Sequence, residues 1–183
     1  MASRAEVSVL FQLAPFSGTV RLSPGKDVEC PELAALVQQA LLPALRLELY
    51  PKTSIDVHIT VVEMDGSPLG SAAHAVTAAS AALAEAGIEM YGLVTGSSSS
   101  AITSLMNDRQ HWTVDSSYNE AVHASTHLFL TAMPALERTT CYSLQGPVYE
   151  PNILREITDA LFAACGKVHS VLAQSLYKLD HSF

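Results

Sequence analysis

Positive charge is scarce in this sequence of 183 residues. Ten lysines and arginines stand against eighteen aspartates and glutamates, which gives a net charge of −8. The basic side chains are scattered, and no window gathers them into a dense basic run. A broad surface that binds nucleic acid by neutralising phosphates needs an excess of Lys and Arg. The composition therefore excludes such a surface and leaves only local or shared contacts with RNA.

Cysteine is also sparse. Cys30, Cys141 and Cys165 lie far apart, so the sequence offers neither a CxxC pair nor an even number of thiols for a disulfide framework. No stretch approaches the roughly 18 uninterrupted apolar residues of a membrane span, and the first residues lack the pattern of a signal peptide. We therefore expect a soluble protein in a reducing, intracellular compartment.

Recognisable catalytic motifs are missing too. The run 96–100 lacks the Gly-Lys-Ser/Thr ending of a P-loop, and we expect it to be a flexible loop. His123 and His127 are four residues apart without an HExxH pattern, which favours a surface or hydrogen-bonded pair over a zinc site. Asp65 and Asp108 have the neighbours typical of turns. The residues alone therefore predict no catalytic residue, no metal site and no cofactor.

Apolar residues are plentiful. They make up 49% of the sequence against 15% charged residues, and the mean hydropathy is +0.23. A chain of this length can form one domain with a substantial core, and we expect a single domain over residues 1–183. The apolar surplus suggests a partner surface as well.

Hydrophobic periodicity predicts a mixed α and β fold. Alternation of apolar and polar residues predicts strands at 7–13 and 55–61, and three-four spacing predicts a helix over 151–178 whose apolar stripe we assign to the core, with a partner face as the alternative. Trp112 is expected to be a partly buried strand residue. Further helices are predicted at 31–46, with Pro43 leaving the second half open, and at 69–86, and further strands at 90–94, 113–114, 127–133 and 140–144. This order favours an α+β or α/β layer fold with helices covering the sheet.

Several segments resemble the ribonuclease PH family. Residues 50–62, followed by Asp65-Gly66, and residues 76–90 carry the resemblance. Within the family, segments 14–18, 39–51, 87–96 and 171–176 are most similar to ring subunits of the eukaryotic RNA exosome. The resemblance implies the ribonuclease PH-like mixed sheet, of the ribosomal protein S5 domain 2-like kind. Because family domains normally begin with several more strands, we expect this form to be shortened at its N-terminus.

The resemblance also implies where catalytic carboxylates would lie. Active members are phosphorolytic exoribonucleases with two aspartates on one strand-loop segment, and residues 114–121 resemble that segment. Asp115 retains the first carboxylate, whereas the second position falls on Ala121, and Glu120 is one place short. If the segment is extended, a one-residue offset turns the Glu120 side chain to the opposite face.

The arginines of active members are absent at the corresponding positions. The phosphate-binding arginine aligns with Ala72, after Gly70-Ser71, or with Leu69 in the alternative alignment. Arginines expected along the first helix fall on Gln39 and Leu42. Phosphate and RNA are both anionic, so loss of these positive charges should abolish phosphorolysis.

The resemblance thus implies a non-catalytic structural subunit of the exosome ring, which supports 3′-to-5′ RNA processing and degradation, including rRNA maturation, mRNA decay and RNA surveillance. Implied partners are other ribonuclease PH-like ring subunits, S1/KH-type cap subunits and RNA in the shared channel, with no membrane. Implied locations are nucleus, nucleolus and cytoplasm. Two alternatives stay open: an active phosphate-dependent 3′-to-5′ exoribonuclease that uses Asp115 and Glu120, and a truncated form that does not assemble. RNA-contacting residues are not identified.

Overall fold

The chain forms six strands, four α-helices and three short 3-10 helices within the residues that the computed structural model describes, namely 4–18, 21–23, 28–103, 110–148 and 150–180. The strands are β1 (Glu6–Leu13), β2 (Ser54–Val61), β3 (Thr95–Thr103), β4 (Gln110–Val114), β5 (Thr126–Met133) and β6 (Arg138–Gln145). The helices are α1 (Pro31–Leu41), α2 (Pro68–Glu85), α3 (Tyr118–His123) and α4 (Pro151–Asp180), with η1 (Leu42–Ala44), η2 (Leu47–Leu49) and η3 (Pro134–Leu136).

The strands form two separate sheets. β1 and β2 pair in parallel, with Val7 opposite Ile55 and Leu13 opposite Val61, and α1 lies in the connection between them. The second sheet is antiparallel with the strand order β4-β3-β5-β6. β3 is therefore a central strand, paired on both of its edges.

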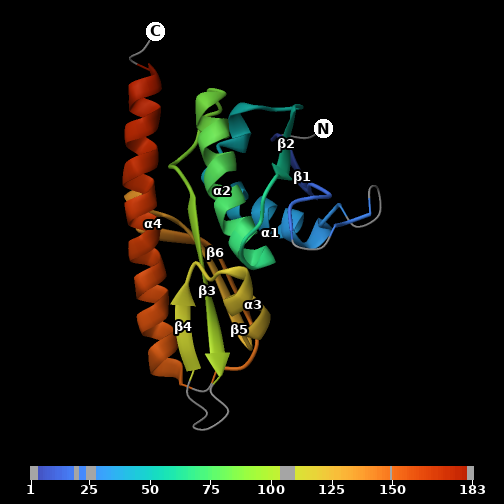
Figure 1. Cartoon of the computed structure of the whole chain (residues 1–183). Helices are drawn as coiled ribbons and strands as arrows, with labels where there is room; N and C mark the ends of the chain where they lie inside the picture. Colours follow the sequence, from blue (N-terminus) through green and yellow to red (C-terminus); the bar gives the residue numbers. More distant parts are fainter. Residues whose placement is uncertain (1–3, 19–20, 24–27, 104–109, 149, 181–183) are drawn as a thin grey trace.

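Helices cover both faces of the four-stranded sheet. On β5, Leu128 and Leu130 pack with Leu161 and Cys165 of α4, whereas the intervening Phe129 belongs to a second buried cluster formed with α1, α2 and β1. Alternating side chains of a strand point to opposite faces, so β5 contributes to both clusters. Figure 1 shows α2 between α4 and the β1–β2 pair. None of the helices in the described ranges has the length and apolar character needed to span a membrane.

Most predicted helices and strands are confirmed. The apolar stripe of α4 is buried in its first half and exposed further along the helix. Leu161 and Cys165 are fully buried, as expected of core residues. Val168 and Val171, further along the helix, are 41% and 64% exposed. The core assignment therefore holds for the first half of α4 and fails for Val168, while the exposed Val171 lies outside the predicted stripe.

Two sequence predictions are wrong, and the structure decides a third point that the sequence left open. Residues 97–100 lie in the middle of β3 and not in a flexible loop. Pairing with β4 and β5 provides hydrogen-bond partners for their backbone groups, and this tertiary context outweighs local strand propensity. Residues 90–94 form no strand; Met90 makes an isolated bridge to Leu45, and the strand begins at Thr95. The second half of the first helix, which the sequence left open at Pro43, is absent: α1 ends at Leu41, since Pro43 cannot continue the hydrogen-bond pattern. The single, N-terminally shortened domain stays a prediction.

Candidate functional site: an acidic cleft

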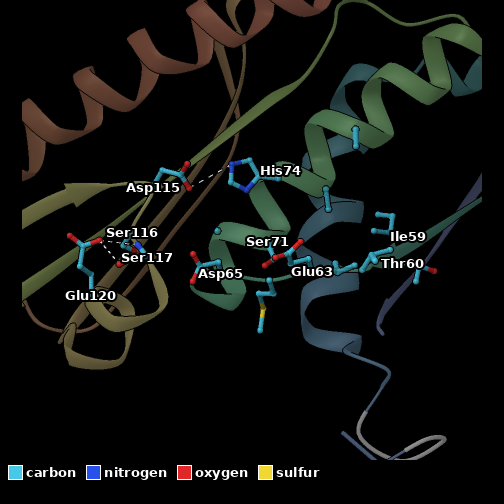
Figure 2. A pocket seen from close by; sticks show the side chains of 17 residues that line it. Ile59, Thr60, Glu63, Asp65, Ser71, His74, Asp115, Ser116, Ser117 and Glu120 are labelled. Carbon is cyan, nitrogen blue, oxygen red and sulfur yellow. Dashed lines mark hydrogen bonds and ion pairs between the residues drawn. The ribbon is translucent and has the colours of Figure 1, made fainter. Parts of the chain in front are cut away.

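A cleft of about 710 Å³ opens where the end of β2, the start of α2 and the β4–α3 connection meet. Figure 2 shows side chains from these three segments around it. The cleft brings together Gly70, Ser71, Asp115 and Glu120, which the sequence connects only through the family resemblance. The geometry can therefore test what that resemblance implies.

The start of α2 is held against β3. Ser67 caps the helix, its hydroxyl accepting a hydrogen bond from the Gly70 backbone N–H at 2.9 Å, and Pro68 occupies the first turn. A Cβ at Gly70 would lie 3.2 Å from both the Ser67 and Ser98 hydroxyl oxygens, so this position needs a glycine or a small shift of its neighbours. Ser71 and His74 follow on the face of α2 that lines the cleft.

Neither candidate position for the missing arginine faces the cleft. Ala72 is fully buried and Leu69 is 6% exposed, and both belong to the core cluster. Gln39 and Leu42, the counterparts of the helix arginines, are exposed and do not line the cleft. Both α2 positions therefore belong to the core and not to the lining of the cleft.

Asp115 occupies a constrained position at the end of β4. Its φ is 55°, a left-handed conformation that Asp tolerates better than most residues, and its N–H donates to the Ser98 carbonyl at 2.9 Å. The next residue, Ser116, is buried, and its hydroxyl lies 2.8 Å from that of Ser100. These contacts hold the Asp115 carboxylate at the cleft, where it lies 3.6 Å from Nε2 of His74.

Glu120 lies in the same cleft but already has partners. Glu120 belongs to α3 and not to an extended segment. The expectation that its side chain points to the opposite face of an extended chain is therefore wrong. Its carboxylate accepts hydrogen bonds from the Ser117 N–H and hydroxyl, both at 2.9 Å, in a capping box. The backbone hydrogen bond from Ser117, followed by the hydroxyl bond, lowers the pKa of Glu120. Glu120 therefore completes a helix cap.

The electrostatics of the cleft disfavour anions. Its lining includes four acidic residues and one histidine: Glu63, Asp65, His74, Asp115 and Glu120. No lysine or arginine occurs among the described residues that line it. Glu63 and His74 have no recognisable signal in the sequence, and only the chain's tertiary path brings them here. Phosphate and an RNA backbone would meet uncompensated negative charge in this cleft.

Other candidate residues lie elsewhere. His123 is exposed on α3, whereas His127 of β5 has its Nδ1 3.0 Å from the Ser100 hydroxyl oxygen. In the described part of the chain, no three His, Cys, Asp or Glu residues are placed to hold a metal. Trp112 is partly buried on β4, as predicted. Arg46 is ion-paired with Glu89 at 2.7 Å.

His127 should make stability depend on pH. Burial lowers its pKa below the ordinary value, so the unfolded chain binds the proton more tightly. Stability is therefore complete above about pH 6.5 and falls as the pH drops through the folded-state pKa. We expect His127→Gln to flatten the pH dependence of the unfolding free energy measured by urea denaturation between about pH 7 and 5. His58→Gln, at an exposed site on β2, is the control that should keep the wild-type slope.

Comparisons with known proteins agree with this fold. Residues 1–89 match the family model "RNase_PH: 3' exoribonuclease family, domain 1", so the Asp115 segment lies outside the match. The chain is similar to "Exosome complex component MTR3" of Homo sapiens, with 34% identity over 177 residues that cover 97% of this chain and 63% of the relative. The mouse protein of the same name is 34% identical over 181 residues, again 63% of its length. The chain thus spans less than two thirds of these relatives.

A solved structure supports the same assignment. Rice (Oryza sativa) Rrp46 superposes with a TM-score of 0.73 at 20% sequence identity, covering 96% of this chain and 75% of that one. This likeness concerns the fold and confirms the predicted ribonuclease PH-like arrangement of mixed sheets and covering helices. The match of residues 1–89 identifies a ribonuclease PH domain, and the chain is similar to exosome components over 97% of its length.

Proposed function

We propose that the chain acts as a non-catalytic structural subunit of the RNA exosome ring, which supports 3′-to-5′ processing and degradation of RNA. The acidic cleft carries this proposal. Gly70, Ser71 and Asp115 meet at one place, yet four carboxylates and no Lys or Arg line the described surface around them. Phosphorolysis must bring inorganic phosphate and RNA together, and this lining repels both.

The similarity to exosome components over 97% of the chain supports a role in such an assembly. The partners in this proposal are other ribonuclease PH-like ring subunits, S1/KH-type cap subunits and RNA in the shared channel. The proposed locations are the nucleus, nucleolus and cytoplasm. The exposed Val168 and Val171 on α4 are apolar side chains that a neighbouring subunit could cover.

The experiment has an assembly arm and an activity arm. We expect co-expression with the other ring subunits to give a stoichiometric assembly, measured by pull-down and native mass determination. The same assembly should release no nucleoside diphosphates from single-stranded RNA and phosphate, even at high protein concentration.

Asp115→Asn is the matched control for the activity arm. Phosphate-dependent release by wild type that disappears in Asp115→Asn would contradict the non-catalytic role and support the phosphorolytic alternative. A chain that stays monomeric beside all ring subunits would contradict the structural role. The two arms can therefore fail separately.

A further inference from the structure

The acidic cleft continues into a second hollow. This hollow, of about 430 Å³, is lined by Phe16, Ser17, Gly18 and residues 62–65, and residues 62–65 also line the cleft. The two hollows therefore adjoin along the end of β2 and the connection to α2. We call them together the acidic groove. A groove of this extent is larger than a single small ion needs.

The acidic groove combines negative charge with exposed apolar surface. Phe16 is 70% exposed and Val62 is 61% exposed, and both line the second hollow. Glu63 and Asp65 line both hollows, and Asp115 lies in the cleft. No lysine or arginine is present among the described lining residues of either hollow. This combination is complementary to cationic side chains that alternate with apolar ones.

Ser17 provides an independent sign of a ligand. It is 4% exposed, and its hydroxyl has no hydrogen-bond partner among the described residues. Its backbone is held on both sides, since its N–H donates to the Ala14 carbonyl and its carbonyl accepts from the Met64 N–H at 2.7 Å. A buried hydroxyl without a partner is unfavourable, and the residue that carries it lines the second hollow. A group bound there could form the missing hydrogen bond.

We propose that the acidic groove binds an extended segment of a partner protein that carries lysine or arginine. Its cationic side chains lie against Glu63, Asp65 and Asp115, an apolar side chain covers Phe16 and Val62, and a polar group of the segment bonds the Ser17 hydroxyl. The proposal does not depend on the role in the exosome ring, because binding is measured on the chain itself.

The test uses a fluorescein-labelled peptide of three Lys-Arg-Leu repeats and fluorescence anisotropy with the full chain. We expect the triple variant Glu63→Gln/Asp65→Asn/Asp115→Asn to weaken binding about tenfold or more. The matched variant changes the same number of charges on exposed helix positions outside the groove: Glu85→Gln, Glu156→Gln and Asp159→Asn. It should change binding less than about threefold, because it leaves the local charge pairs intact.

Ser17→Ala separates the hydrogen bond from the charge. This variant should weaken the peptide several-fold while its melting temperature stays equal to that of wild type or rises, since it removes an unsatisfied hydroxyl. Equal loss of binding in both triple variants would overturn the proposal in favour of attraction by net charge alone. Absence of peptide binding to wild type, or tighter binding of a labelled single-stranded RNA in the same groove, would also overturn it.

Discussion

Replacing Gly96 with alanine is expected to destabilise the fold by about 3 kcal/mol, at the upper end of what overpacking usually costs. A Cβ at Gly96 would lie 2.4 Å from the Ala73 carbonyl oxygen and 2.8 Å from the Ala73 Cα. Both atoms are backbone, so neither can rotate away. Relief requires that α2 move off β3, which would also break the hydrogen bond from the Gly96 N–H to the Thr77 hydroxyl at 3.0 Å.

Gly166→Ala is the matched control. Gly166 lies within α4, and a Cβ there would have no atom within 4 Å. Alanine should therefore stabilise the chain by about 0.5 to 1 kcal/mol, because glycine is unfavourable inside a helix. Urea denaturation followed by circular dichroism measures both variants. Similar stability of Gly96→Ala and wild type would show that α2 and β3 are not packed as described.

The second large effect concerns the position that aligns with the phosphate-binding arginine of the family. We expect Ala72→Arg to cost on the order of 5 kcal/mol, comparable with the whole stability of a domain, and to give insoluble or unfolded protein. Ala72 is fully buried in the core cluster with residues of α1, α2 and β1. A guanidinium there would have neither water nor a counterion, and its volume would force the helices apart.

Ser71→Arg tests the same helix one residue earlier. Ser71 is partly exposed and lines the cleft, so its side chain can extend among the carboxylates. The folding free energy should change by less than about 1 kcal/mol, since arginine is also the better helix former. Soluble yield and thermal denaturation distinguish the two variants. If Ala72→Arg were as stable as Ser71→Arg, the α2 face assigned to the core would be wrong.

These two variants bear directly on catalysis. If α2 keeps the face described here, an arginine cannot reach the cleft from position 72 without a rotation of the helix. At the cleft, α2 instead presents His74, whose side chain is 66% exposed. Its Nε2 lies 3.6 Å from the Asp115 carboxylate. In the proposed non-catalytic role, the orientation of the helix would then matter as well as the identity of one residue.

Periodic segments were predictable because their signal is local. The alternation over 55–61 and the three-four spacing over 151–178 each indicate a face that packs on the core, and β2 and the first half of α4 do so. The resemblance located Gly70, Ser71 and Asp115, which do share a cleft. The serines at 97–100 were mistaken for a loop because their strand depends on neighbours distant in sequence, β4 and β5.

By itself, the sequence determined the shortage of positive charge, the three separate thiols, the periodicity of the regular elements and the resemblance to the ribonuclease PH family. Those properties depend on composition, on spacing within one element, or on segments that can be compared directly. Only the tertiary structure decided that Ala72 points into the core, and that Glu63 and His74 join Asp115 in one acidic cleft. The reason is physical: these positions depend on how α2 packs against β3 and on contacts between segments that are distant in the chain.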